Sequence, residues 1–223
     1  MLDRVLRLVV TTLFFGGLLF LTAGTVAWPA AWAYLALVTA SLAVYSVNIV
    51  RLHPDLIRER RKPPGDAKKW DWPLVAVVGA LGPLVLLALC GFDRRLGWSS
   101  PMPAWLNLVG LLLVAAGHAL ANYAFAANRF FSALVRIQHD RGHTVVDSGP
   151  YRFVRHPGYL GSILQMFGTG FALGSWWALD VAAAVSLVVA VRTAVEDRTL
   201  RRELEGYAEY AARVRFRLVP GIW

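Results

Sequence analysis

The sequence predicts an all-α integral membrane protein with about four transmembrane helices, a C-terminal transmembrane helical hairpin and a cytoplasmic helical tail. Hydrophobic residues make up 57% of the 223-residue chain, and the mean hydropathy is +0.50. The apolar residues also gather into five long runs. About 20 apolar helical residues cross a bilayer core, where the backbone must satisfy its own hydrogen bonds.

Four of these runs are each long enough to cross the bilayer once. They cover residues 5–27, 29–50, 73–92 and 104–127. The fifth run, 160–191, has about 32 residues, which is too long for one straight span and too short for two. Near its middle, Gly174-Ser175-Trp176-Trp177 combines a turn signal with interfacial aromatic residues. We therefore expect a helical hairpin that enters and leaves on the same side.

Basic residues are concentrated in segments that would lie on one side of the membrane. All but two of the 23 Lys and Arg residues lie near the N-terminus or in segments 51–71, 128–157 and 192–223. The exceptions are Arg94 and Arg95. By the positive-inside tendency the basic side is cytoplasmic, so both termini are expected there. The net charge of +9 then reflects topology and contact with anionic lipids, and no nucleic-acid partner is predicted.

We divide this compact membrane domain into two parts. Residues 1–127 supply the first four transmembrane helices, and residues 128–223 supply a polar loop, the hairpin and the cytoplasmic C-terminal helix. The one cysteine, Cys90, lies inside a predicted span. Neither a disulfide framework nor a metal site is therefore expected.

The polar segment before the hairpin, 149–159, places two Arg, one His and two Tyr between apolar runs. Polar groups at a membrane boundary are costly to desolvate and usually serve a ligand. Pro157 disfavours helix at His156, so His156, Arg155 and the first free amides of the helix should lie near one point. Such a point suits a carboxylate or another anion. The alternative is an interfacial anchor in which Arg155 reaches lipid phosphates.

A second charged cluster lies where the hairpin's second helix leaves the membrane. Arg192 and Glu196 are one helical turn apart, and Asp197 follows directly. The plain interpretation is a solvated amphipathic helix, but the apolar residues before and between Arg192 and Glu196 indicate burial. A carboxylate there can bind ribose hydroxyls or an ammonium group, and an arginine can hold an anionic substrate.

The fourth span carries polar residues on one face. His118 and Asn122 share this face with Phe125 and Arg129. Polar residues inside a membrane indicate either a functional site or interhelical hydrogen bonding. We expect His118 and Asn122 to form a wall of the substrate pocket.

The two polar clusters resemble the signature of the isoprenylcysteine carboxyl methyltransferase family, which related phospholipid methyltransferases share. The resemblance covers residues 138–223, whereas residues 1–127 match only as membrane spans. It rests on His143-Thr144-Val145-Val146, Gly149-Pro150-Tyr151, Arg155-His156-Pro157-Gly158-Tyr159, Arg192, Glu196-Asp197, Leu200, Tyr207, Tyr210 and Pro220.

The sequence departs from this signature twice. The family usually has paired glutamates where this chain has Glu196-Asp197. It also usually places an aromatic-Gly pair two residues before the first tail tyrosine, whereas Glu205-Gly206 here adjoins Tyr207 directly. The tail geometry is therefore less closely defined by the resemblance than the cofactor site.

The resemblance implies an enzyme that uses S-adenosylmethionine and has no soluble Rossmann-type fold, and the chain has no G-x-G-x-x-G after a strand. The polar loop within residues 128–223 would then be the cofactor-binding loop. The catalytic residues, expected to orient an anionic substrate group, are Arg155 and Arg192. The implied cofactor contacts are His143, Tyr151, His156, Tyr159, Glu196 and Asp197.

The expected acceptor is lipophilic, and a carboxylate is favoured because it needs no general base. A phospholipid, or another amine or thiol, is an alternative acceptor that would have to lose a proton. Another alternative is an NADPH-dependent membrane sterol-type reductase, which shares the Arg-His-Pro element but usually has Asn in place of Gly158. A transporter or scaffold is the non-enzymatic alternative, and the repeats typical of transporters are absent from the sequence.

Overall fold

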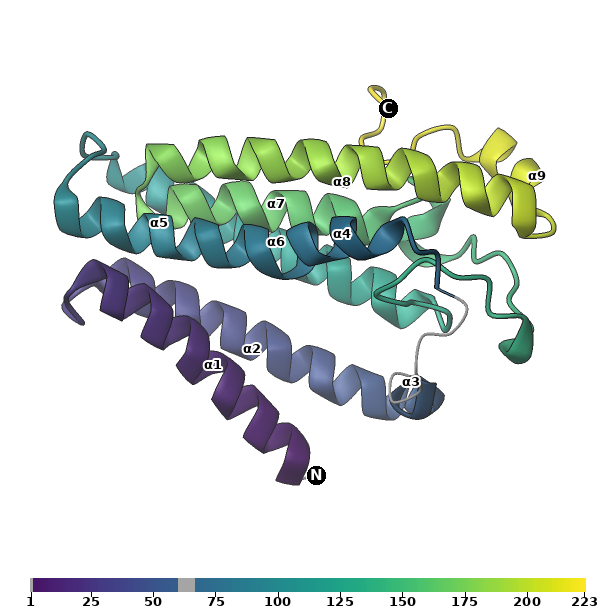
Figure 1. Ribbon diagram of the computed structural model, residues 1–223, viewed down its shortest axis with the longest axis horizontal. Helices are drawn as coiled ribbons and strands as arrows, with labels where there is room; N and C mark the ends of the chain where they lie inside the picture. Colours follow the sequence, from purple (N-terminus) through teal and green to yellow (C-terminus); the bar gives the residue numbers. More distant parts are fainter. Residues whose placement is uncertain (1, 60–66) are drawn as a thin grey trace.

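The computed structural model describes residues 2–59 and 67–223, and this part of the chain is helical and contains no strands. Figure 1 shows the helices arranged as an elongated bundle. In chain order the helices are α1 (Leu2–Ala23), α2 (Pro29–Arg51), α3 (Pro54–Glu59), α4 (Asp71–Ala76), the π-helix η1 (Val77–Leu81), α5 (Gly82–Leu96), α6 (Ala104–Ala127), the 3-10 turns η2 (His139–Arg141) and η3 (Gly149–Arg152), α7 (Pro157–Leu173), α8 (Trp176–Glu203) and α9 (Tyr207–Arg213).

The predicted fold class is confirmed. Five helices are long and apolar enough to cross a membrane: Arg4–Ala23, Pro29–Arg51, Asp71–Leu96, Ala104–Ala127 and Trp176–Glu203. Their outward apolar side chains are exposed, as lipid-facing residues of a multi-pass membrane protein must be; Leu21, for example, is 79% exposed.

The fifth apolar run forms the predicted hairpin from α7 and α8, which lie side by side in Figure 1. Gly174 ends α7 in the left-handed region (φ +75°), and Ser175 caps α8 by accepting a hydrogen bond from the Ala178 amide at 3.2 Å. The Ser175 hydroxyl also donates to Asp93, near the end of α5. The hairpin turn therefore lies at the same end of the bundle as the loop between α5 and α6.

Close packing of α6 against α7 fixes the start of the hairpin. A Cβ atom on Gly117 would lie 2.5 Å from the Gly161 carbonyl oxygen, and one on Gly168 would lie 2.7 Å from the Val114 nitrogen. Larger residues would push the two helices apart, so small residues permit this contact. As a result, the start of α7 is held beside the end of α6.

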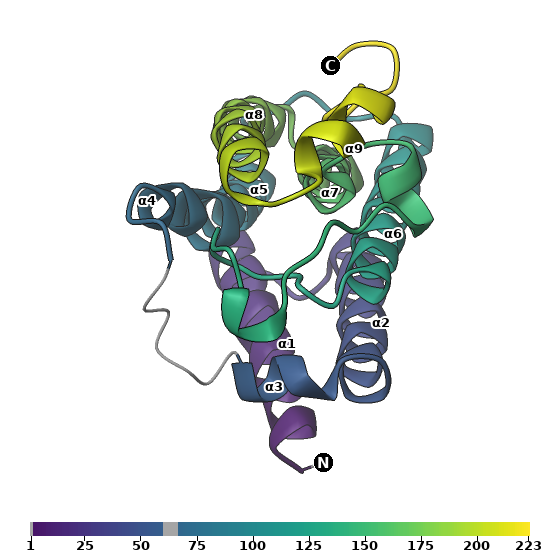
Figure 2. The same ribbon diagram turned by 90° about the vertical axis from the view of Figure 1, so that its right-hand side faces the viewer.

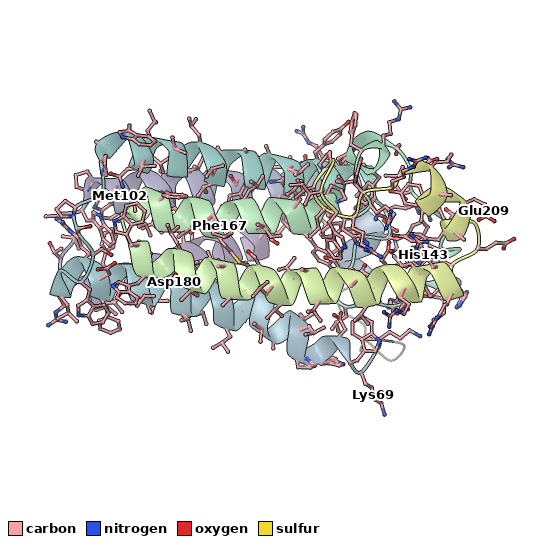
Figure 3. The ribbon with its side chains drawn as sticks, turned by 90° about the horizontal axis from the view of Figure 1, so that it is seen from above. Lys69, Met102, His143, Phe167, Asp180 and Glu209 are labelled. Atoms are coloured by element: carbon pink, nitrogen blue, oxygen red, sulfur yellow. The ribbon has the colours of Figure 1, made fainter. Side chains whose placement is uncertain are left out.

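The polar loops gather at the opposite end of the bundle from the hairpin turn. We call this end, which carries residues 67–70, 128–156 and 204–223, the basic end. Figure 2 views it directly and shows the loop after α6 crossing in front of the helices, with α9 beside the end of α8. Figure 3 places Lys69, His143 and Glu209 at this end and Met102 at the other.

Candidate active site

A cavity of about 120 Å³ lies at the basic end, between the loop after α6, the start of α7, the end of α8 and α9. His143, labelled in Figure 3, lies in its wall. The predicted site residues that line this cavity are His143, Tyr151, Arg155, His156, Tyr159, Arg192 and Glu196. The structure thus brings together seven side chains from three segments: the loop after α6, α7 and α8.

His156, Tyr159 and Glu196 form the connection between the two sequence clusters. The rings of His156 and Tyr159 stack, with centroids 5.6 Å apart and an interplanar angle of 4°. The Tyr159 hydroxyl donates a hydrogen bond to Glu196. His156 is extended (φ −127°, ψ 60°) and Pro157 starts α7, as predicted from the Pro157 effect on the preceding residue. This geometry places an imidazole, a phenol and a carboxylate around one space.

Arg192 occupies the cavity wall as one half of a buried ion pair. Its Nε and Nη2 atoms lie 2.7 and 2.9 Å from the two carboxylate oxygens of Asp71, which is 0% exposed. Nη2 also donates to the Ala133 carbonyl oxygen at 2.6 Å, and the Val135 amide donates to Asp71 at 2.8 Å. The guanidinium lies 5.0 Å from the centroid of the Tyr159 ring. The ion pair therefore holds the loop residues 133–135 against α8. Arg192 also faces the Tyr159 ring.

Asp71 was not predicted as a site residue. Its partner lies 121 positions away, so no local spacing reveals the pair. The available signal was an acidic residue at the start of an apolar span, since a buried carboxylate needs a charged partner.

Arg155 lines the cavity, but its hydrogen bonds go to the protein. Nε and Nη2 donate to Asp197 at 2.6 and 3.1 Å, and Nη1 donates to the carbonyl oxygens of Val214 and Arg215 at 2.6 and 2.8 Å. The Arg155 side chain is 2% exposed. Its predicted role in orienting a substrate stays a prediction, and its contacts favour a role in holding the C-terminal segment.

Asp197 lies outside the cavity lining, unlike its neighbour Glu196. Successive residues of an α-helix point about 100° apart, so Glu196 and Asp197 leave α8 in different directions. Asp197 is 1% exposed and faces Arg155 and Tyr207, whose hydroxyl donates to it at 3.1 Å. The structure therefore separates the acidic pair that the sequence predicted as one group of cofactor contacts.

Tyr151 and His143 form the side of the cavity next to the loop. The Tyr151 hydroxyl accepts a hydrogen bond from the Asn128 side-chain amide at 3.2 Å. The backbone carbonyl oxygen of Tyr151 accepts one from the Tyr210 hydroxyl at 2.8 Å. His143 Nδ1 accepts from the Gln138 amide at 3.3 Å. Burial raises the pKa of Tyr151, so its hydroxyl keeps its proton and can donate.

His143 is a neutral imidazole at physiological pH. Burial, together with the positive charges of Arg136, Arg141 and His139, lowers the pKa of His143 to about 4. Its ring packs on Phe130 with centroids 4.5 Å apart. Because Nδ1 accepts a hydrogen bond, the proton of the neutral ring lies on Nε2, which can act as a donor.

His118 and Asn122 do not line this cavity. Asn122 donates to the His118 carbonyl oxygen at 3.0 Å within α6, and Phe125 of the same face packs on Tyr45 of α2 with ring centroids 4.6 Å apart. Phe125 of this face turns toward α2. The cavity begins only beyond α6, at Asn128. These two residues therefore lie away from the candidate active site.

The cavity offers several kinds of binding group without a metal site. Glu196 supplies acceptors, the phenols and His143 supply donors, and Leu200 and Leu204 supply apolar surface. Within residues 2–59 and 67–223, no group of three His, Cys, Asp or Glu side chains could hold a metal ion. The cavity at the end of the bundle is lined by aromatic rings and one carboxylate, and it is therefore a candidate site for a small polar molecule.

Comparisons with known proteins show similarity to membrane methyltransferases. Residues 105–205 match the phospholipid methyltransferase family model. Human protein-S-isoprenylcysteine O-methyltransferase is 34% identical over 118 residues, which cover 49% of this chain and 40% of that protein. Protein-S-isoprenylcysteine O-methyltransferase B of Arabidopsis thaliana is 32% identical over 113 residues, which cover 49% of this chain and 57% of that protein. The chain is thus matched over about half the length of these curated relatives.

The fold also resembles a solved structure, that of the eukaryotic intramembrane Ras methyltransferase ICMT (isoprenylcysteine carboxyl methyltransferase). The TM-score is 0.56 at 20% sequence identity, and the match covers 94% of this chain and 73% of the ICMT chain. At that identity the likeness shows a shared fold. The chain is therefore similar to the phospholipid methyltransferase family over residues 105–205, and it shares the fold of a membrane methyltransferase.

Proposed function

We propose that this protein transfers a methyl group from S-adenosylmethionine to a carboxylate on a lipophilic acceptor. The observation that carries the proposal is the cavity in which Tyr159 and Glu196 meet His156 and His143. The curated relatives bear the name of an O-methyltransferase acting on protein-S-isoprenylcysteine. That name supports a carboxylate, carried on a lipidated protein or a small isoprenoid, as the acceptor class.

The side chains of the cavity fit the chemical groups of the methyl donor. Glu196 can accept hydrogen bonds from ribose hydroxyls or an ammonium group. Tyr151 and His143 can donate to a carboxylate. The Tyr159 ring can favour a cation, as its contact with the Arg192 guanidinium illustrates. The donor, when bound, supplies an activated methyl group on a sulfonium.

The residues of the chain contribute positioning and exclusion of water. A carboxylate acceptor is already a nucleophile at neutral pH, so no side chain has to remove a proton. Arg192, held by Asp71 against the cavity wall, is proposed to orient the acceptor carboxylate through its charge. Arg155 and His156 are buried in the cavity wall, which we propose limits the access of water to the bound donor. Orientation and desolvation of this kind can supply much of the rate of a displacement at carbon.

We further propose that both termini and the cavity face the cytoplasm. The cavity lies at the basic end, which is the cytoplasmic end by the positive-inside tendency. The donor would then reach the cavity from the cytoplasm and the acceptor laterally from the bilayer.

Product analysis tests the proposal. Membranes containing the protein are incubated with methyl-labelled S-adenosylmethionine and a small S-prenylated cysteine, and the label is expected in a base-labile ester that releases methanol. The matched control is the same prenylcysteine with its carboxylate already esterified, which should remain unlabelled. Base-stable label on phosphatidylethanolamine, or thermal stabilisation by NADPH in place of S-adenosylhomocysteine, would refute the proposal.

A further inference from the structure

Asp197 is the centre of a charged cluster behind the cavity wall. Its oxygens lie 2.6 Å from Arg155 Nε, 3.2 Å from Arg201 Nε and 3.1 Å from Arg217 Nε. The Tyr207 hydroxyl donates to it at 3.1 Å, and His156 Nε2 lies 3.5 Å away. A carboxylate this deeply buried is stable only if it is paired, and three guanidinium groups surround this one.

Two of these arginines connect Asp197 to the C-terminal tail, which we define as residues 214–223. Arg217 comes from the tail itself. Arg155 donates to the carbonyl oxygens of Val214 and Arg215 at 2.6 and 2.8 Å. The carboxylate of Asp197 therefore anchors the tail both directly and through Arg155.

The tail in turn holds the backbone next to the cavity. The amide of Arg155 donates to the Phe216 carbonyl oxygen at 3.0 Å, and the amide of His156 donates to the Arg217 carbonyl oxygen at 2.9 Å. The His156 ring, stacked on Tyr159, faces the cavity that Asp197 does not reach. Asp197 and the tail thus hold residues 155–156 on the side that faces away from the cavity.

We infer that Asp197 is a positioning residue: it seats the tail against residues 155–156 and so sets the His156 ring in the donor cavity without touching the donor. Its neighbour Glu196 contacts Tyr159 inside the cavity. The two adjacent carboxylates would therefore have different roles: Glu196 would bind the donor, and Asp197 would hold the cavity wall in place. The part about the donor rests on the proposed function, whereas the seating of the tail does not.

The test compares Asp197→Asn with Glu196→Gln, two changes that each remove one charge at adjacent positions. Hydrogen–deuterium exchange of residues 214–223 reports the seating of the tail, and titration with S-adenosylhomocysteine reports the donor site. Asp197→Asn should speed exchange in the tail and raise the Kd by about tenfold or more. Glu196→Gln should raise the Kd and leave exchange in the tail unchanged.

A second variant covers the case in which Asp197→Asn does not fold. Arg217→Met removes the direct link between tail and carboxylate while leaving Arg155 and Asp197 paired. It should speed exchange in the tail and raise the KM for the donor more than it lowers kcat, because the binding wall loosens while the reacting groups remain. A variant that merely lowered the folded fraction would lower kcat alone.

Two results would overturn the inference. One is an Asp197→Asn protein that loses affinity while its tail exchanges as slowly as in the wild type, which would make Asp197 a direct donor contact. The other is an unchanged tail and unchanged affinity in both Asp197→Asn and Arg217→Met. If the wild-type protein binds no S-adenosylhomocysteine, the proposed function fails, while the exchange data still decide whether Asp197 seats the tail.

Discussion

Tyr159 donates its hydroxyl hydrogen to Glu196, which lies 37 positions further along the chain, and thereby joins the two helices of the hairpin at the cavity. The hydrogen bond orients the carboxylate, and the Tyr159 ring also stacks on His156 and contacts the Arg192 guanidinium. One side chain thus aligns the groups that we propose hold the methyl donor.

Removing the charge of Glu196 or the hydroxyl of Tyr159 should weaken donor binding. We expect Glu196→Gln and Tyr159→Phe each to cost about 1–3 kcal/mol in S-adenosylhomocysteine affinity, the range for a hydrogen bond to a charged group. Isothermal titration of the two single variants and the double variant forms a double-mutant cycle. Because the two groups act together, the double variant should lose less than the sum of the single losses. Strictly additive losses would show that the hydrogen bond does not matter for binding.

The imidazole of His156 should contribute separately. His156→Ala is expected to weaken S-adenosylhomocysteine binding by about 1–3 kcal/mol, because a buried ring and its stacking on Tyr159 are both lost. His118→Ala is the matched control, since His118 lies on α6 outside the cavity. Equal losses of affinity in the two variants would contradict the placement of the site at the basic end.

The membrane spans could be predicted from the sequence because the length of an apolar run decides whether a helix crosses a bilayer. The hairpin was predictable for a similar reason, since Gly174 interrupts a run too long for one helix. The meeting of His156 with Glu196 was predicted from the family resemblance and from the polar character of both clusters at the membrane boundary.

Helix orientation and distant pairing were not predictable in the same way. The spacing of His118 and Asn122 gives their shared face but not which neighbouring helix that face meets. Adjacent carboxylates look alike in sequence, yet Glu196 faces the cavity and Asp197 faces the tail. The partner of Asp71 depends on how α4 packs against α8, which only the folded bundle reveals.

The Asp71–Arg192 pair should contribute strongly to stability. Asp71→Ala leaves a mostly buried guanidinium without its counterion, which typically costs about 3–5 kcal/mol. We expect a large fall in the thermal unfolding midpoint of the purified protein in detergent. The double variant Asp71→Ala, Arg192→Met should recover part of this loss, because it removes the unpaired charge. A double variant less stable than Asp71→Ala would contradict the importance of the buried charge.

Acidification should destabilise the fold through His143. The pKa of His143 is about 4 in the folded protein, because burial and nearby positive charges disfavour its protonation, against about 6.5 for an unfolded histidine. The unfolded state therefore binds more protons between these values. The stability that the neutral ring contributes is fully present above pH 6.5 and is lost as the pH falls toward 4.

The measurement is the unfolding midpoint of wild type and His143→Gln at pH 7 and pH 5. Glutamine does not titrate, so the wild type should lose more stability on acidification than the variant. An equal loss in both proteins would show that His143 does not keep its depressed pKa.

Membrane topology can be tested by introducing one cysteine at a time, because the native Cys90 is fully buried and should not react. Lys69→Cys and Glu209→Cys place exposed thiols at the basic end, as Figure 3 shows, and Ser100→Cys places one in the loop before α6 at the other end. A membrane-impermeant thiol reagent applied to intact cells should label Ser100→Cys only. After the cells are opened, the other two should react as well, because the positive-inside tendency places the basic end in the cytoplasm. The unchanged protein controls for reaction at Cys90. Labelling of Lys69→Cys or Glu209→Cys in intact cells would reverse the orientation and move the donor cavity to the outer face.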